Sequence, residues 1–357
     1  MPRNPTNISR RHVLLSLSAL GSVAFCASSG QAADDNKAAD DKTPTNMQFA
    51  LDRAVDAIAA PFVLADARGL YRAENLNVTT TVAAGSKETI ARVASGACDM
   101  ALADLNALIR YRGESDAATV KAVFVLLNVA PYAIVARKSR GVISLGSLEG
   151  KVLGVADRDL AVRLWPALAK RNNIKLAAVK LERISAAVRE PMLSAGQVDA
   201  VTGFSYLSAV NLRDRGVPAD DLAVFRFAEF GSAAYGLALI VNPKFAAARP
   251  EAVKAFIRAV TAGTQLAIQD PAKAITDVMT QMENGSRELE LTRLHIAITD
   301  NILTDDVRRD GLGGIDAARF EASLNEIAED FTFKKRPSGA DIFDDSFLPG
   351  SVGRKMN

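Results

Sequence analysis

Short runs of β-forming residues alternate with segments of helical periodicity from Met47 onward. This alternation predicts an α/β protein with a mainly parallel sheet. The strand-forming runs lie at 48–51, 77–82, 100–103, 122–127, 152–155, 177–181, 200–202, 223–227 and 237–241. The fold class is therefore the first property that the sequence constrains.

Helix boundaries are marked between these runs. Ser86 is placed to cap a helix that Gly96 stops. Asp157 or Asp159 is placed to cap a later helix, in which Pro166 predicts a kink or a restart. Further amphipathic helices without intervening strands are expected at 250–268, 272–282 and 316–330. We expect these late helices to coat the outside of one lobe.

Two long apolar runs, at 132–136 and 235–241, bracket a compact α/β stretch. A chain of 357 residues is long for a single core, so two lobes are expected. The bracketing predicts lobe I at 47–131 plus 237–357 and lobe II at 132–236, with two hinge strands joining them and a ligand cleft between them. The alternative is one continuous sheet.

The N-terminus has the order of a secretory signal. Basic residues precede an apolar run at 13–27, and small residues follow it, which predicts an export signal over 1–32. Residues 33–46 lack periodic apolar positions and are predicted to form a disordered leader. No later apolar segment approaches the ~20 residues of a membrane span. The mature protein is therefore expected to be soluble in the periplasm, in a Gram-negative bacterium.

Ser9, Arg10 and Arg11 resemble the start of a twin-arginine signal, which exports folded proteins. Val13 stands where that signal usually has Phe. The alternative is a Sec signal whose basic end happens to contain two arginines.

Composition excludes several functional classes. The 43 Lys and Arg balance 41 Asp and Glu, so no global charge is available to hold nucleic acid or an anionic membrane. Cys26 lies in the predicted signal, which leaves Cys98 as the single mature thiol and rules out a disulfide framework. His295 is the only mature histidine, so no metal centre or His-based catalytic centre is expected.

Several motifs occur in an order that resembles the periplasmic binding proteins for aliphatic sulfonates, taurine, nitrate and thiamine pyrimidine precursors. The matching segments are 47–71, 84–86, 94–99, 148–151, 193–200, 250–256 and 315–316. The resemblance implies a type II periplasmic-binding fold and a small-molecule ligand. It also implies an inner-membrane ABC permease with its ATPase as partners. We expect a monomer without a cofactor.

The candidate ligand residues follow strands, because the cleft of an open α/β sheet forms outside the carboxyl ends of its strands. In lobe I, Gly85, Ser86 and Lys87 offer backbone approach, a hydroxyl and free N–H groups to an acceptor oxygen. The alternative for this loop is an ordinary N-cap turn. Asp52 is a hydrogen-bond acceptor, and Arg53 presents a fork for a carboxylate or sulfonate. The alternative for these two is a mutual surface pair.

Further candidates lie on other loops. Asp104 is a candidate that also has the spacing of a helix cap. In lobe II, Asp157 and Arg158 stand at a helix start, where the carboxylate disfavours an anion. A stacking wall is predicted from Phe204, Tyr206 and Tyr235, with packing in the core as the alternative, and Ser205 is a further ligand candidate beside it. The asymmetric cleft suits a zwitterion or an amino-heterocycle better than nitrate.

Three functions are weighed. The first is the solute-binding subunit of an ABC importer. The second is an enzyme related to the thiamine-pyrimidine synthase, which by resemblance needs an active-site His, a Lys for pyridoxal and a Cys-rich segment. The third is a sensor that presents its ligand to a membrane receptor. With one mature His, one mature Cys and no recognisable nucleophile pair or P-loop, the sequence predicts that the chain is not an enzyme.

Overall fold

The computed structural model describes residues 43–114, 119–156 and 159–356. These residues form one compact unit. The predicted export signal, the leader up to residue 42, and Asp157 and Arg158 lie outside the described residues. Among the described residues no helix has the length and apolar character that crossing a membrane requires.

The described strands form two five-stranded sheets, ordered β2-β1-β3-β10-β4 and β7-β6-β8-β5-β9. Their bounds are β1 Thr45–Leu51, β2 Leu76–Val82, β3 Met100–Asp104, β4 Lys121–Val125, β5 Tyr132–Arg137, β6 Val152–Val155, β7 Lys180–Arg183, β8 Ala200–Phe204, β9 Leu222–Arg226 and β10 Leu237–Val241. We refer to the half of the molecule built on each sheet as lobe I and lobe II. The predicted α/β class is confirmed.

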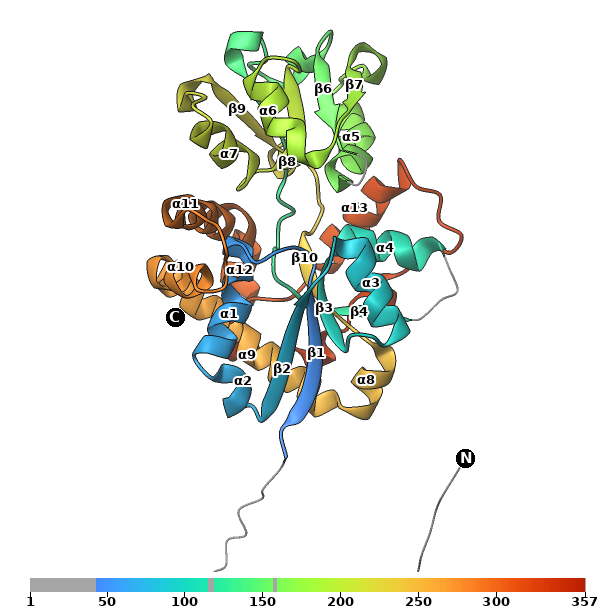
Figure 1. Cartoon of the computed structure of the whole chain (residues 1–357). Coiled ribbons are helices and arrows are strands. Elements are labelled where there is room, and N and C mark those ends of the chain that lie inside the picture. The colour runs from blue at the N-terminus through green and yellow to red at the C-terminus, as the bar shows by residue number, and fades with distance from the viewer. Residues whose placement is uncertain (1–42, 115–118, 157–158, 357) are drawn as a thin grey trace, which may run out of the picture. The chain divides into compact units, whose positions relative to one another are not determined.

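Each sheet contains one strand that runs against its neighbours. In lobe I, β1 is parallel to β2 and β3, whereas β10 is antiparallel to β3 and β4. In lobe II, β6 is parallel to β7 and β8, whereas β5 is antiparallel to β8 and β9. The two antiparallel strands are the ones that begin just after the chain passes from one sheet to the other (Figure 1).

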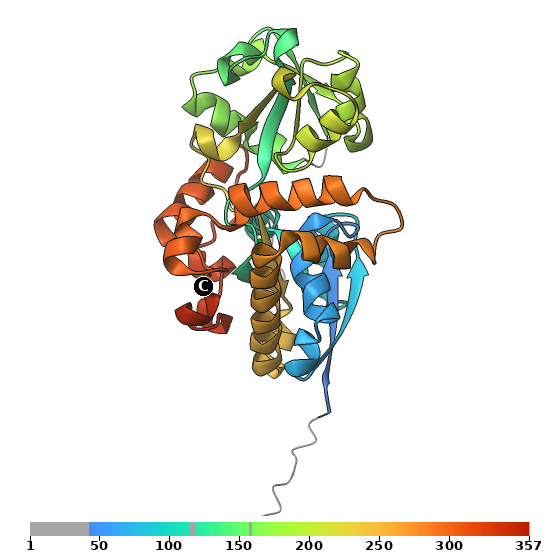
Figure 2. The same ribbon diagram turned by 90° about the vertical axis from the view of Figure 1, so that its left-hand side faces the viewer.

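Helices cover both sheets. Their bounds are α1 Ala60–Ala67, α2 Leu70–Ala73, α3 Ser86–Ser95, α4 Leu105–Glu114, α5 Leu160–Arg171, α6 Arg189–Ser194, α7 Ser208–Asp214, α8 Pro243–Ala248, α9 Pro250–Gln269, α10 Pro271–Met279, α11 Arg287–Ala297, α12 Asp305–Asp310, α13 Ala317–Ala328, α14 Gly339–Ile342 and α15 Ser351–Arg354. The predicted late helices correspond to α9, α10 and α13, while α11 and α12 were not predicted. All of these late helices belong to the half built on the first sheet (Figure 2).

The core of lobe I depends on a close helix contact. Helix α9 packs beside α1 in the buried cluster that also contains Phe49 and Phe256 (Figure 2). A Cβ atom on Gly263 would lie 2.2 Å from the carbonyl oxygen of Pro61, so only glycine fits at this crossing. The contact fixes the loop after β1, which precedes α1.

Four local predictions differ from the structure. Ser86 does not cap α3, because Gly85 occupies the N-cap position with φ +113° and Ser86 is the first helical residue. Strand β7 begins at Lys180, since the chain before it forms the short 3-10 helix Leu176–Ala178. Helix α5 continues through Pro166 as one helix instead of restarting. Strand β1 begins at Thr45, inside the predicted leader.

Candidate functional site

The predicted site residues of lobe I lie where its strands end. Asp52 and Arg53 directly follow β1, Asp104 is the last residue of β3, and Ser86 opens α3 after β2. Because β10 runs antiparallel to β3, the start of β10 also lies here, with Leu237 opposite Asp104. The site is therefore built at the edge where the chain crosses between the lobes.

Asp52 and Arg53 form a buried bidentate pair. Arg53 Nε donates to Asp52 Oδ1 over 3.0 Å, and Arg53 Nη2 donates to Oδ2 over 2.7 Å. Asp52 is 3% exposed and Arg53 is 29% exposed. The alternative of a mutual pair is thus realised, but it is enclosed rather than solvated. Because Arg53 balances the charge of Asp52 and donates to both of its oxygens, Asp52 does not act alone as an acceptor for a ligand.

Arg53 also contacts the other lobe. Its Nη1 donates to the Tyr206 hydroxyl over 3.3 Å, and its guanidinium carbon lies 5.1 Å from the centre of the Phe204 ring. The two rings are nearly stacked, with centroids 5.8 Å apart. Burial raises the pKa of Tyr206 above its usual range, so its hydroxyl stays protonated. The Arg53 guanidinium of lobe I therefore lies against the side chains of Phe204 and Tyr206 in lobe II.

Ser86 links the Asp52 carboxylate to the backbone of Asp104. Its Oγ donates to Asp52 Oδ2 over 3.3 Å and accepts from the backbone N–H of Asp104 over 3.0 Å. Lys87 is exposed and has no polar partner among the described residues. The Gly85-Ser86-Lys87 loop is therefore more than a simple cap, because its hydroxyl is part of the site's hydrogen-bond network.

Asp104 lies in a buried triad that spans both lobes. The Tyr132 hydroxyl, from the start of β5 in lobe II, donates to Asp104 Oδ2. Asn106 Nδ2 lies 3.0 Å from Asp104 Oδ1 and 3.1 Å from the Tyr132 hydroxyl oxygen. Oδ1 also accepts from the Asn106 backbone N–H over 2.8 Å, as expected of a carboxylate at a helix start. Asp104 therefore accepts the predicted bond at the start of a helix, and it also accepts a bond from Tyr132 that the sequence did not predict.

Burial dominates the electrostatics of Asp104. It raises the carboxyl pKa from 3.8 to about 6, against the hydrogen bonds from Tyr132 and Asn106, which lower it. The sequence did not identify Tyr132 or Asn106 as site residues. Tyr132 lay within a run interpreted only as a hinge strand, and no local pattern indicates that its hydroxyl points toward the end of β3.

In lobe II the described part of the site centres on Asp159 and Arg189. Asp159 Oδ1 caps α5 by accepting from Ala161 N over 2.9 Å, as predicted for this helix start. Its Oδ2 accepts from Arg189 Nη1 over 2.8 Å. Both side chains are largely buried, at 5% and 11% exposure. Arg189 was not predicted, because it lies on α6, far along the chain from the cap it contacts.

The two remaining candidates, Ser205 and Tyr235, make different contacts from those of Phe204 and Tyr206. Ser205 is buried, donates its N–H to Pro131 O over 2.7 Å, and has an Oγ without a partner in the described residues. Tyr235 does not join the wall of Phe204 and Tyr206. Its hydroxyl and ring are engaged by residues of the segment around α13, described below. Of the three aromatic residues predicted to form one wall, Phe204 and Tyr206 therefore contact each other, whereas Tyr235 contacts other residues.

A shallow hollow of about 560 Å³ adjoins Arg53. Asp56 and Glu290 line it together with Ser286, at the start of α11, and Arg293. Burial raises the pKa of Asp56 from 3.8 to about 6, although Arg53 lowers it. A much smaller cavity of about 10 Å³ under Asp52 holds at most one water. The hollow has a size that small organic ligands occupy in proteins.

This arrangement of two sheets with a polar junction is matched by known proteins. The family model described as "NMT1/THI5 like" matches residues 57–274, more than half of the chain. The chain belongs to the NMT1/THI5-like family. The sequence resemblance to periplasmic binding proteins is confirmed at the level of the fold and family.

Solved structures share the fold. The aliphatic sulphonate binding protein SsuA of Escherichia coli superposes with TM-score 0.68 at 12% identity, covering 86% of this chain and 94% of that one. The alkanesulfonate-binding protein SsuA of Xanthomonas axonopodis pv. citri, bound to MOPS, gives TM-score 0.64 at 14% identity, covering 84% and 98%. At these identities the likeness establishes the shared periplasmic-binding fold alone.

Curated relatives in the NMT1/THI5-like family are enzymes by name. The 4-amino-5-hydroxymethyl-2-methylpyrimidine phosphate synthase of Schizosaccharomyces pombe is 25% identical over 223 residues, which cover 60% of this chain and 63% of the relative. The synthase of Aspergillus parasiticus is 25% identical over 227 residues, covering 61% and 65%. The match thus spans less than two thirds of each relative's length.

These relatives correct the prediction that the chain is not an enzyme. That prediction was based on the scarcity of His and Cys and on the absence of recognisable catalytic motifs. Proteins named as synthases nevertheless match about 60% of this chain. An inventory of residue types therefore does not separate binding proteins from enzymes in this family.

Proposed function

We propose that this chain is the extracytoplasmic solute-binding subunit of an ABC importer and captures a small polar organic solute between its lobes. The observation that carries the proposal is the contact of Arg53 in lobe I with Phe204 and Tyr206 in lobe II. A solute that replaces part of this contact touches both lobes at once. Such a solute favours the closed arrangement through its differential affinity.

The chemistry of the junction defines the solute class. Arg53 has five N–H donors, and three of them are engaged, two by Asp52 and one by Tyr206, so two remain for a ligand. A sulfonate or carboxylate accepts from such a fork. The adjacent aromatic rings suit a flat or apolar part of the same molecule. We therefore propose a sulfonate or an amino-heterocycle with an acidic group.

The proposed location and partners follow from this role. The protein acts in the periplasm as a monomer, after export by the predicted twin-arginine signal, and delivers its solute to an inner-membrane permease with an ATPase. The structural neighbour from Staphylococcus aureus is named a ligand-binding component of an ABC-type import system, at 12% identity and TM-score 0.64. Replacing Arg10 and Arg11 by Lys tests the export route, because retained periplasmic yield excludes the twin-arginine pathway.

The test of solute capture is identification of the bound molecule. Protein purified from its native periplasm is denatured, and the released small molecules are identified by mass spectrometry. Calorimetric titration of stripped protein with the identified compound then measures its affinity. A released sulfonate or heterocyclic acid that binds again with one-to-one stoichiometry supports the proposal. Release of no small molecule from repeated preparations contradicts it.

A second candidate is the synthesis of a pyrimidine phosphate, which the names of the curated relatives favour. The purified protein is added to an extract of a strain that lacks its gene, and chromatography with mass spectrometry follows 4-amino-5-hydroxymethyl-2-methylpyrimidine phosphate. An increase that depends on the protein supports this candidate. An unchanged level, with solute capture demonstrated, favours the importer.

A further inference from the structure

The chain passes between the lobes twice, and the two passages lie side by side. The first crossing, residues 126–131, joins β4 to β5, and the second crossing, residues 231–236, leads to β10. Backbone N–H groups bond between the crossings, with Gly236 to Leu127 O over 2.9 Å and Ala130 to Ala234 O over 3.1 Å. A Cβ on Gly236 would lie 2.8 Å from Leu127 Cβ. The crossings are thus packed against each other.

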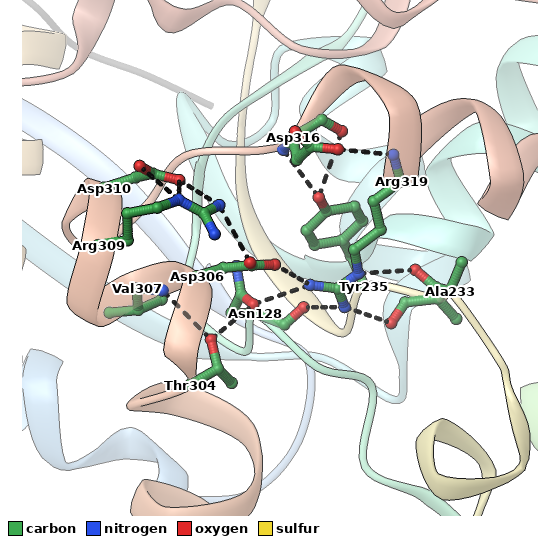
Figure 3. Close-up of polar contacts among 11 residues, drawn as sticks. Asn128, Ala233, Tyr235, Thr304, Asp306, Val307, Arg309, Asp310, Asp316 and Arg319 are labelled. Atoms are coloured by element: carbon green, nitrogen blue, oxygen red, sulfur yellow. Dashed lines mark hydrogen bonds and ion pairs between the residues drawn. The ribbon is translucent and has the colours of Figure 1, made fainter.

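Arg319, on α13, forms hydrogen bonds with both crossings (Figure 3). It bonds to Asn128 in the first crossing, with Nη1 to Oδ1 over 2.9 Å and Nη2 to the carbonyl oxygen over 2.7 Å. In the second crossing, Nη2 donates to Ala234 O and Nε donates to Ala233 O, each over 3.2 Å. Its guanidinium carbon lies 4.1 Å from the centre of the Tyr235 ring.

The fifth donor of Arg319 is also used. Nη1 lies 3.2 Å from Asp306 Oδ2 on α12, so every N–H of the guanidinium has a partner. Three of those partners are backbone carbonyl oxygens of the crossings. The planar group therefore fixes the spacing between the two crossings rather than merely balancing a charge.

Neighbouring residues of the same C-terminal segment hold the crossings at further points. The Tyr235 hydroxyl accepts from Asp316 N over 2.9 Å (Figure 3). Glu326 Oε2 accepts from Ala233 N over 3.0 Å. On the first crossing, Asn301 pairs with the backbone of Val129, and Thr304 Oγ1 donates to Asn128 Oδ1 over 2.8 Å. Residues 301–326 therefore contact both crossings at several points, and we call this segment the brace.

A hinge motion between the lobes requires changes in backbone torsions within the crossings. Any change that separates residue 128 from residues 233–234 breaks bonds to Arg319. We propose that Arg319 is a positioning residue that sets the resting arrangement of the two lobes by holding both crossings to one guanidinium. This inference depends on the lobe closure assumed in the proposed function, but it concerns the protein without solute.

The experiment measures the distance between the lobes in solute-free protein. Spin labels are attached at Glu251→Cys in lobe I and Ile143→Cys in lobe II, which are 77% and 71% exposed. Buried Cys98 is replaced by Ala in every sample. Pulsed electron resonance then gives the distribution of label distances in the parent and in Arg319→Lys, which keeps the charge but loses the fork.

The matched control is Arg309→Lys. Arg309 lies on neighbouring α12, is 60% exposed, and binds Asp306 and Asp310 without contacting a crossing. Arg319→Lys should roughly double the width of the distance distribution, because the lobes sample more arrangements. Arg309→Lys should leave the width unchanged. An unchanged width in Arg319→Lys, or equal broadening in both variants, overturns the proposal.

A second variant covers failure to fold. If Arg319→Lys does not fold, Asn128→Ala is measured in its place, because it removes the side-chain acceptor by which the first crossing binds Arg319 Nη1. Broadening supports the brace, and an unchanged width contradicts it. Since no solute is present, these outcomes do not depend on whether the protein captures one. Failure of solute capture is detected separately, by the release experiment above.

Discussion

Two arginines join parts of the molecule that are far apart in sequence, and they do so differently. Arg53 shares its fork with the single carboxylate of Asp52, lies over Phe204, and keeps two N–H groups without a partner among the described residues. Arg319 uses all five donors, mostly on backbone carbonyls. Arg53 is 29% exposed, whereas Arg319 is 18% exposed.

This difference separates two kinds of contact between the lobes. Once the guanidinium is removed, the carbonyl oxygens of Asn128 and Ala233 have no other donor among the described residues, so its loss should cost stability. The Arg53 contact can be exchanged for a ligand oxygen, so its loss should mainly cost binding. Substitutions near Arg319 should therefore affect mainly stability, and substitutions of Arg53 should affect mainly binding.

The largest effect on stability is expected from Arg319→Leu. The carbonyl oxygens of Asn128 and Ala233 lose their donor and Ala234 O loses one of two, which should lower the free energy of unfolding by about 3 kcal/mol. Urea denaturation followed by circular dichroism measures it. Arg309→Leu is the control and should change the value by about 0.5 kcal/mol or less, because its ion pairs are exposed. Equal losses in both variants would show that the brace has no special role.

A smaller loss is expected from Tyr132→Phe. The substitution leaves the buried carboxyl of Asp104 without one of its donors, at a cost of about 2 kcal/mol. The matched control is Tyr111→Phe, since Tyr111 is only partly buried and its hydroxyl has no hydrogen bond to another residue within 43–114, 119–156 and 159–356. Thermal melts of the two variants compare them. A melting temperature of Tyr132→Phe as high as that of Tyr111→Phe would contradict the triad.

The pH dependence of stability should differ between the parent and Asp104→Asn. Burial raises the folded-state pKa of Asp104 from 3.8 to about 6, so the folded protein holds this proton more tightly than the unfolded chain. The resulting stability is fully present below pH 3.8 and is lost as pH rises through about 6. Asp104→Asn should therefore cost more stability at about pH 4 than at about pH 7. Denaturation curves at both values check this, and a constant difference would argue against a buried, protonated carboxyl.

The smallest effect is expected at the rim of the cleft. Lys87→Gln removes an exposed charge that has no polar partner in the described residues, so stability should change by about 0.5 kcal/mol or less. Ser86→Ala is the informative neighbour, because its hydroxyl bridges Asp52 and Asp104. It should cost about 1 kcal/mol in the same denaturation measurement. A larger loss for Lys87→Gln than for Ser86→Ala would reverse the assignment within this loop.

Local patterns were enough to predict most strands and the loops that follow them. Apolar runs and small residues such as Gly96, at the end of α3, depend only on short-range sterics and burial, which the sequence states directly. The exposed edge strand β7 was misplaced because it has no apolar face to mark it. The sequence therefore indicated which loops follow the strands, but not the distant partners of their side chains.

The missed partners are separated from their contacts by long stretches of chain. Arg319 bonds to Asn128 across 191 residues, and Tyr132 bonds to Asp104 across 28. Neither pair has a local spacing that identifies it. Ser86 was predicted to be a cap because the spacing fits one, and only the pairing of β1 with β3 brings its hydroxyl between the Asp52 carboxylate and the backbone N–H of Asp104.

The central claim, that the lobes hold a small solute at Arg53, is tested most directly by native mass spectrometry. The parent and Arg53→Gln are purified from the native periplasm without denaturation, and their masses are compared with the bare chain. The account predicts one added small organic molecule per parent chain and none on Arg53→Gln, with both variants folded. A parent that has no added mass, or an Arg53→Gln variant that retains the same molecule, would contradict it.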